Sequence, residues 1–224
     1  MDMASKDLSI VETIESRVRE DIINGRLVSG EQLIETEMAR KYGVSRNTMR
    51  EVSHMLVRDG LASFIRYRGV FVRTFDLKDL RDIYTARRVL QLYPLQAITC
   101  IPDELLEQMR QTIERAQNEV AQRNSHLVGS LSLYFHRLQV SAFSCSLIND
   151  LFLNISGQLR LIFTLPPDES IVQSPYWIDR EHEIYEWMVK QDMKMVAARL
   201  ADYLDESEKM LSQVVLKWAR PLGS

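Results

Sequence analysis

The stretch Tyr42-Gly-Val-Ser-Arg-Asn-Thr-Met-Arg-Glu51 combines a tight turn with the start of a helix. Its glycine supplies the turn, because glycine adopts a positive φ at little cost, and the serine two residues later is a good helix cap. Arg46 and Arg50 are four residues apart, so they lie on one helical face with Asn47 beside them. Such side chains can reach phosphates and base edges in a major groove of DNA, so the stretch predicts a recognition helix.

Helical spacing precedes this stretch as well. Val11, Ile14, Val18 and Ile22 form one apolar stripe and predict a first helix over Ser9–Asn24, in which the first serine and Glu12 have the spacing of a capping box. We also expect a short second helix over Glu35–Lys41. A third helix should follow, capped by Ser45 and ending at Gly60.

Two short strands follow the third helix. Leu61–Ile65 and Val70–Arg73 have strand-like composition, and Arg66–Gly69 reads as the turn that joins them into a hairpin. Three helices followed by a hairpin make a winged helix-turn-helix, which we assign to residues 1–74. The glycine at position 69 would let the hairpin tip approach DNA closely.

The charge of the chain is unevenly distributed. Residues 36–74 hold eight Lys or Arg residues against three Asp or Glu residues, although the whole chain has a net charge of −3. A basic segment on an otherwise acidic protein is what phosphate binding requires. The alternative is a solvated face with a chance cluster of charges, and the helix-turn-helix pattern favours DNA.

From Leu77 onward the apolar spacing is helical, and the clearest loop lies between Pro166 and Pro175. We therefore predict a mainly α protein whose residues 75–224 form an all-α antiparallel helical bundle. Its helices are expected over Leu77–Leu95, Pro102–Arg123, Leu131–Phe143, Leu147–Leu165, Ile178–Val189 and Asp192–Trp218.

Composition limits the cellular setting. Cys100 and Cys145 lie in apolar helical patterns without a CxxC spacing, which predicts two buried thiols in a reducing compartment. We find no signal-peptide pattern and no apolar run near the ~20 residues of a membrane span. We therefore expect a cytoplasmic protein without a membrane partner.

The stretch from Val18 to Val72 resembles the GntR family of bacterial transcription regulators. The match includes Gly43-Val-Ser-Arg46, Arg50-Glu51, Asp59-Gly-Leu61 and Gly69-Val-Phe-Val72 in the order of that family. The resemblance implies binding to a double-stranded operator. The DNA-contacting residues that it implies are Thr36, Ser45, Arg46, Asn47, Thr48, Arg50, Arg68 and Gly69.

Residues 79–211 resemble the FCD bundle of one branch of that family, through Ile83-Tyr-Thr-Ala-Arg87, Phe135-His136 and Glu181-His182. In that branch the bundle encloses a polar cavity that binds a small carboxylate, often with a divalent metal held by one Asp and three His. Here Ser132 stands at the position of the Asp and Tyr203 at that of the last His.

The substitutions leave only His136 and His182 as weak candidate metal ligands. Zinc prefers about four nitrogen, sulfur or carboxylate ligands, and a neutral serine or a phenol is a poor substitute. We therefore expect no cofactor and disfavour a divalent metal.

The remaining polar set could still bind an anion. Under the resemblance, the residues that would form the ligand site are Arg87, Ser132, His136, Arg160, His182 and Tyr203. An interior arginine with imidazoles and a phenol suits a carboxylate. The alternative is that the histidines are ordinary core residues with hydrogen-bond partners.

These observations predict a transcription regulator, expected to be a repressor, that binds its operator as a homodimer and responds to a small carboxylate metabolite. A second possibility keeps DNA binding but makes the bundle only a dimerisation or protein-interaction module. A remote third is a metal-dependent hydrolase that uses His136 and His182, but no catalytic motif supports it. We therefore expect no enzymatic activity.

Overall fold

The computed structural model describes residues 9–23, 25–172 and 174–219. It divides into two compact units after Thr74, which we call the first unit and the second unit. Among the described residues, no helix has an apolar stretch that is long enough to cross a membrane.

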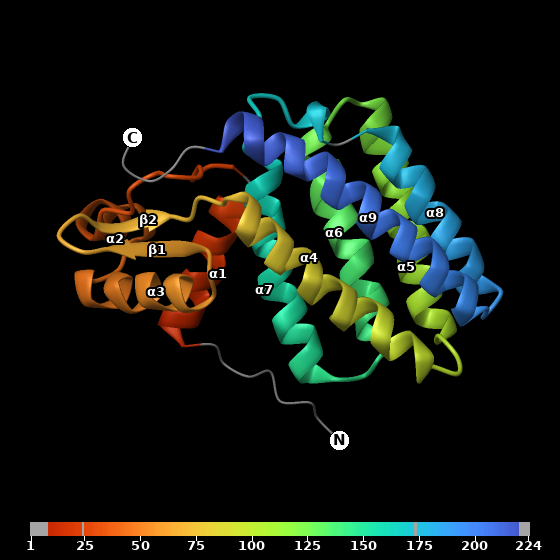
Figure 1. Ribbon diagram of the computed structural model, residues 1–224. Coiled ribbons are helices and arrows are strands. Elements are labelled where there is room, and N and C mark those ends of the chain that lie inside the picture. Colours follow the sequence, from red (N-terminus) through yellow and green to blue (C-terminus); the bar gives the residue numbers. More distant parts are fainter. Residues whose placement is uncertain (1–8, 24, 173, 220–224) are drawn as a thin grey trace, which may run out of the picture. The chain divides into compact units, whose positions relative to one another are not determined.

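The first unit is a winged helix-turn-helix, as the sequence predicts (Figure 1). Its two strands pair antiparallel, with Ala62 opposite Val72 and Ile65 opposite Gly69. The elements are α1 (Ile10–Ile23), α2 (Glu35–Tyr42), α3 (Arg46–Arg58), β1 (Ala62–Ile65) and β2 (Gly69–Val72).

The predicted apolar stripes form the core of this unit, where α1 packs against α3. Side chains spaced by three or four residues meet between these helices and exclude water, which stabilises the unit through the hydrophobic effect. The side chains at this contact are at most 2% exposed and belong to Ile14, Val18, Ile22, Met49, Val52 and Leu56.

Local hydrogen bonds fix where the helices of the first unit begin. The Ser9 hydroxyl accepts from the Glu12 backbone N–H, and the Glu12 carboxylate accepts from the Ser9 N–H, so the predicted capping box is confirmed. The predicted last residue of this helix, Asn24, lies outside the described residues. Between α2 and α3 the chain turns at Gly43, whose φ of 71° is left-handed.

A buried carboxylate joins α1 to α2. Asp21 accepts hydrogen bonds from the Tyr42 hydroxyl at 2.6 Å and from Arg26 Nε at 2.6 Å, and its Oδ2 lies 2.8 Å from Lys41 Nζ. Burial by itself raises the pKa of Asp21, but the hydrogen bonds from Lys41, Tyr42 and Arg26 outweigh it and lower the pKa to about 2.

The second unit is a helical bundle. Within it α5 packs against α6 and α8, α4 packs against α9, and α6 packs against α7. Figure 1 shows α9 crossing the bundle beside α4 and α8. The elements are α4 (Leu77–Leu92), η1 (Tyr93–Gln96), α5 (Asp103–Ala121), α6 (Ser125–Ser141), α7 (Ser146–Phe163), η2 (Glu169–Ile171), α8 (Pro175–Val189) and α9 (Met193–Trp218).

Several predicted boundaries in the bundle are wrong. The helix expected from Leu131 begins at Ser125, because the Asn124 side chain caps it by accepting from the Leu127 N–H. The first bundle helix ends at Leu92 rather than Leu95, and Pro94, which has no N–H, lies in the 3-10 turn that follows.

The expectation of two buried thiols is also wrong. Cys100 is exposed and Cys145 is half-buried. Both lie between helices rather than inside an apolar helical pattern, since Cys100 falls between η1 and α5 and Cys145 is the residue before α7.

The Asp21 cluster generates a prediction about stability in acid. Asp21→Asn should lower the free energy of unfolding of the first unit at pH 7 by about 1–3 kcal/mol, because the variant loses a hydrogen-bonded buried charge. The pKa of Asp21 is depressed from 3.8 to about 2, so its contribution is present above pH 4 and is lost as the pH falls towards 2. The deficit of the variant should shrink over that window, as measured by calorimetry of the full chain.

Asp82→Asn is the matched control. Asp82 also pairs with a lysine, Lys78, at 2.6 Å, but its side chain is 65% exposed. Its removal should change the free energy of unfolding by less than about 0.5 kcal/mol. A deficit in Asp21→Asn that stays constant from pH 4 to pH 2 would contradict the prediction.

Candidate functional site

The exposed side of α3 carries three polar side chains that together form what we call the recognition face: Arg46, Asn47 and Arg50. Met49 and Val52 of the same helix are buried, so the helix separates an apolar side from this polar one. The Arg50 Nη2 atom lies 3.5 Å from the Asn47 Oδ1 atom. Ser45 caps the helix by accepting from the Thr48 N–H, and the two hydroxyl groups are 2.9 Å apart.

An acidic residue of α2 positions one of these arginines. The Arg46 Nε atom donates to the Glu35 carboxylate at 3.2 Å. The contact engages Nε, so the terminal nitrogens of the guanidinium are available for a guanine edge or a phosphate. Thr36, the next residue of α2, is exposed in the first helical turn.

The tip of the hairpin, or wing, contains Arg68 and Gly69. Gly69 has a φ of 97°, a conformation that suits glycine. The Gln32 side-chain amide donates to the Arg68 carbonyl at 2.7 Å and ties the tip to the body of the unit. Sequence reasoning missed Tyr67, which has a φ of 64° and is 89% exposed, with the Arg66 guanidinium 4.7 Å from its ring centre.

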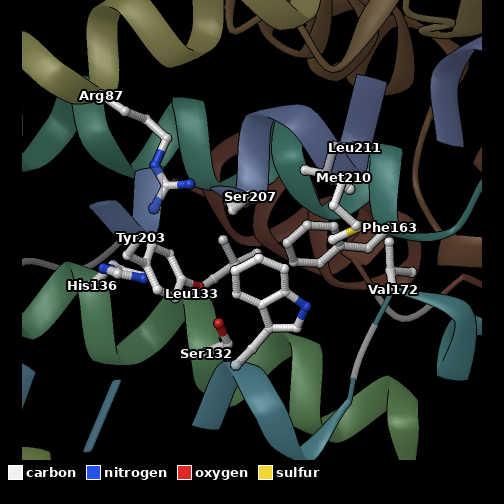
Figure 2. Close-up of a pocket in the computed structure, with 11 residues that line it drawn as sticks. Arg87, Ser132, Leu133, His136, Phe163, Val172, Tyr203, Ser207, Met210 and Leu211 are labelled. Carbon is white, nitrogen blue, oxygen red and sulfur yellow. The ribbon is translucent and has the colours of Figure 1, made fainter. Parts of the chain in front are cut away.

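The second unit contains a small cavity with a polar end and an apolar end (Figure 2). Its open volume is about 10 Å³, which is roughly the space for one water molecule. Figure 2 shows Arg87, His136 and Tyr203 on one side and Phe163, Val172, Met210 and Leu211 on the other. The lining residues are Arg87, Ser132, Leu133, His136, Phe163, Val172, Trp177, Tyr203, Ser207, Met210 and Leu211.

Arg87 supplies a buried cation from α4. Only 2% of this residue is exposed. Its Nε atom donates to the Gln91 side-chain oxygen at 3.0 Å, and its guanidinium lies 5.1 Å from the centre of the Tyr84 ring. Its Nη2 atom is buried without a hydrogen-bond partner among the residues that the structure describes. A buried N–H group in this state is ready to bind an acceptor.

His136 supplies a second donor from α6. The Gln91 amide nitrogen lies 3.2 Å from His136 Nδ1 and donates to the Gln139 side-chain oxygen at 2.8 Å. Burial, together with the nearby Arg87, lowers the pKa of His136 well below its usual value, so the ring is neutral. Because Nδ1 accepts from the amide, the proton belongs on Nε2, which has no hydrogen-bond partner in the described part of the chain.

Glu181 of α8 lies directly behind the polar end, where it bonds to two lining residues, Ser132 and Tyr203, without lining the cavity itself. Its Oε1 atom accepts from the Ser132 hydroxyl and, at 3.0 Å, from the Tyr203 hydroxyl. The same atom is 3.7 Å from His136 Nε2. Burial raises the pKa of Glu181 to about 7, although the two hydroxyl groups and Arg87 oppose the rise.

Sequence reasoning missed Glu181 and chose its neighbour His182. The structure corrects this, because His182 points away from the cavity, with a side chain that is 49% exposed and lies 3.8 Å from Glu186. Helical periodicity could have shown the difference. The buried positions of α8 are Trp177, Ile178, Glu181, Ile184 and Met188, and their spacing includes the glutamate and excludes the histidine.

Arg160 also lies outside the cavity lining. It is fully buried, but its guanidinium pairs with Glu169 at 2.8 Å and donates to the His126 carbonyl at 3.2 Å. This contact ties α7 to η2 and the start of α6. Of the predicted ligand residues, the structure brings together Arg87, Ser132, His136 and Tyr203.

The residues at the cavity do not fit a divalent metal. The donor set holds one imidazole, from His136, and one carboxylate, from Glu181. Among the described residues, no cluster of three or more His, Cys, Asp or Glu side chains comes together. Zinc requires more such ligands than these residues offer.

Each of the two units matches a known protein family. Residues 10–72 match "Bacterial regulatory proteins, gntR family", and residues 82–206 match the FCD domain. The HTH-type transcriptional repressor RspR of Escherichia coli K12 is 22% identical over 199 residues, which are 88% of this chain and 86% of that protein.

A second relative is the uncharacterized HTH-type transcriptional regulator YdhC of Bacillus subtilis. It is 30% identical over 105 residues, which are 45% of this chain and 47% of that protein. The chain thus spans less than half the length of the first curated relatives that it matches. The crystal structure of a protein from Rhodococcus sp. RHA1, described as a GntR transcriptional regulator, has the same fold, with a TM-score of 0.81. Its sequence identity is 24%, and the match covers 94% of this chain and all of that one.

The buried carboxyl group generates a prediction about stability in base. Glu181 has a pKa near 7 when folded, against 4.5 for an ordinary glutamate. Between these values only the unfolded state releases the proton, so stability falls as the pH rises from 4.5 to 7 and then levels off. Glu181→Gln cannot ionise, so without added ligand it should exceed the wild type by about 2–4 kcal/mol at pH 8 and match it near pH 4.

Denaturant unfolding of the second unit, followed through its tryptophan fluorescence, measures this difference. Glu186→Gln on the same helix is the control, because the Glu186 side chain is 48% exposed. Its effect should stay below about 0.5 kcal/mol at every pH. Parallel stability curves for Glu181→Gln and the wild type between pH 4.5 and 8 would refute the prediction.

Proposed function

Because the chain belongs to the GntR family of bacterial regulatory proteins and carries an FCD domain, we propose that this DNA-binding transcriptional regulator binds its operator as a homodimer and releases it when a small carboxylate enters the cavity. Members of this family are transcription factors, not enzymes. The single observation that carries the proposal is a pair of buried N–H groups at the cavity, on Arg87 and His136, that have no hydrogen-bond partner among the described residues.

The recognition face supports the operator half of the proposal. Arg46 and Arg50 are exposed and suit guanine edges or phosphates, and Asn47 is exposed beside Arg50. Ser45 and Thr48 are better suited to phosphates, because their hydroxyl groups already bond to each other at the helix start. Thr36 and the wing residues Arg68 and Gly69 would add contacts to the backbone or the minor groove.

Dimerisation follows from the amount of sequence that one helix can read. A single recognition helix contacts only a few base pairs, so specificity in a genome requires two half-sites. We infer that two copies of this chain bind a pseudo-palindromic operator. An effector that prefers one dimer geometry over another would then change the operator affinity.

Repression is the direction that we propose, and the cytoplasm the compartment. The relative RspR, which matches across most of both chains, is named a transcriptional repressor. A repressor that blocks a promoter until a metabolite arrives needs a unit that binds DNA and a unit whose ligand causes release of the DNA. We propose these two roles for the first and the second unit.

The small size of the cavity favours one alternative. A space of about 10 Å³ holds no metabolite as it stands. The second unit could therefore serve only for dimerisation or protein interaction, with Arg87 and Glu181 as buried polar residues of a closed core. Ligand binding separates the two functions, because only the first requires the cavity to open.

The operator half generates a prediction. The target is a DNA duplex that has first been selected from random sequences for binding to the wild type. Arg46→Ala and Arg50→Ala should each weaken binding to this duplex by about 1–3 kcal/mol, because each removes a base or phosphate contact. Titration of labelled duplex by fluorescence anisotropy measures the affinity. The slope of log affinity against log salt concentration should fall by about one for a lost phosphate contact and less for a lost base contact.

Arg81→Ala is the control for this experiment. Arg81 is an exposed arginine of α4 whose Nε atom donates to the Leu77 carbonyl of its own helix. Its removal should leave the affinity within a factor of about two. If both recognition-face variants bind as tightly as the wild type, the assignment of this face is wrong.

The effector half generates a second prediction. Among acetate, pyruvate, lactate, succinate, benzoate and leucine, at least one should raise the melting temperature of the wild type and release the selected duplex. Arg87→Met should abolish both effects, because the variant loses the cation of the cavity. Arg110→Met, which removes a half-buried arginine of α5 outside the cavity lining, should retain them. If the wild type binds DNA and none of the six compounds acts, dimerisation alone is the better account.

A further inference from the structure

Two buried ionisable groups lie at the polar end of the cavity: Arg87 lines it, and Glu181 lies behind the lining residues Ser132 and Tyr203. Neither forms an ion pair with a charged group among the described residues. The Arg87 guanidinium and the Glu181 carboxyl group are 2% and 1% exposed. Within the described residues, no ion pair joins Arg87 to any carboxylate, and the nearest basic group to Glu181 is the His136 ring at 3.7 Å. That ring is neutral because burial lowers its pKa.

We propose that the effector is a zwitterion, namely an α-amino acid with an apolar side chain, whose carboxylate binds Arg87 and His136 and whose ammonium group binds Glu181. This inference rests on the proposed function, since it names the chemical class of the effector in the same cavity. It assigns Glu181 as a ligand-binding residue that the metal-containing pattern of the family does not include.

The carboxylate end of the ligand follows from the two unpartnered donors. Arg87 Nη2 and His136 Nε2 are both buried at the cavity, and both carry an N–H group that needs an acceptor. A carboxylate has two oxygens and can accept from both. Its negative charge also supplies the ionic partner that the arginine lacks.

The ammonium end follows from Glu181. This carboxyl group already accepts from two neutral hydroxyl groups, those of Ser132 and Tyr203, so what its ionised form lacks is a positive charge rather than another neutral donor. A simple carboxylate ligand would bring a second anion next to it, which buried groups tolerate poorly. A zwitterion adds no net charge and neutralises both protein groups at once.

The apolar end of the cavity fits the side chain of such a ligand. Phe163, Met210 and Leu211 face the cavity on the side away from His136 (Figure 2). Trp177 also lines the cavity, and its ring packs edge-on against the Tyr203 ring, with 5.3 Å between their centres. An aliphatic or aromatic side chain would therefore lie among apolar groups while the charged end of the ligand reaches the polar ones.

Binding must enlarge the cavity, because about 10 Å³ cannot hold an amino acid. Met210 is the lining residue best able to move, since its side chain is unbranched and flexible. It lies on α9, which also carries Tyr203, so a ligand that displaces it acts on a helix that packs against both α4 and α8. The ligand thus changes the bundle itself, as a regulatory ligand must.

The test uses three carboxylates that share an isobutyl side chain and differ at the carbon next to the carboxylate. Leucine has an ammonium group there, 2-hydroxy-4-methylpentanoate has a hydroxyl group, and 4-methylpentanoate has a hydrogen. Leucinamide, which keeps the ammonium group and lacks the carboxylate, completes the set. Phenylalanine and alanine series of the same design cover larger and smaller side chains. Calorimetric titration of the full-length wild type should show the amino acid binding at least tenfold tighter than each analogue in at least one series.

Glu181→Gln should lose at least tenfold in affinity for that amino acid and should bind the analogue without the ammonium group as tightly as the wild type or more tightly. His182→Gln is the control, since the neighbouring side chain is exposed and should leave both affinities unchanged. A cooperative denaturant transition, followed through the tryptophan fluorescence of the second unit, shows that Glu181→Gln is folded there. Glu181→Asp, which keeps the carboxyl group on a shorter side chain, should recover part of the preference.

The outcomes distinguish the zwitterion proposal from the proposed function on which it rests, regulation by a carboxylate effector. If the carboxylates without an ammonium group bind as well as the amino acids, or if Glu181→Gln keeps the preference, the zwitterion is wrong and a carboxylate effector stands. If no compound of either kind binds a wild type that binds DNA, the effector function fails and the zwitterion fails with it.

Discussion

The cost of taking charge out of water constrains the second unit more than any other interaction. Arg87 and Glu181 are both buried and no ion pair joins them, so each must be stabilised by neutral dipoles. Gln91 and the Tyr84 ring do this for the arginine, and Ser132 and Tyr203 do it for the glutamate. Helices α4, α6, α8 and α9 must therefore hold their relative positions for the polar end of the cavity to exist.

Regulation by such a cavity needs a difference in ligand affinity between two states of the protein. A compound that binds both states equally shifts nothing, however tightly it binds. The described state has room for about one water molecule at the cavity, so a ligand selects a more open state. The free energy that the buried charges gain from the ligand is then the source of the shift, and the helices that carry those charges are the parts that respond.

Sequence predicted local features better than register between helices. The recognition face follows from a four-residue spacing and a serine cap, and the structure exposes the two arginines as that spacing requires. The cavity depends on which face of α8 turns inward, and the ligand pattern of the resembling family gave His182 instead of Glu181. The early start of α6 was missed because its cap, Asn124, precedes a segment without a clear apolar stripe.

Two buried arginines of the bundle show why burial alone does not identify a ligand site. Arg160 and Arg87 are both at most 2% exposed, and each keeps one terminal nitrogen without a hydrogen-bond partner in the described chain. Arg160, however, has the Glu169 carboxylate at 2.8 Å, so its charge is already neutralised and it holds η2 in place. Arg87, beside the cavity, contacts an amide oxygen and an aromatic ring but pairs with no carboxylate of the described residues. The missing counter-charge, rather than the buried cation, is what makes Arg87 a site for an external anion.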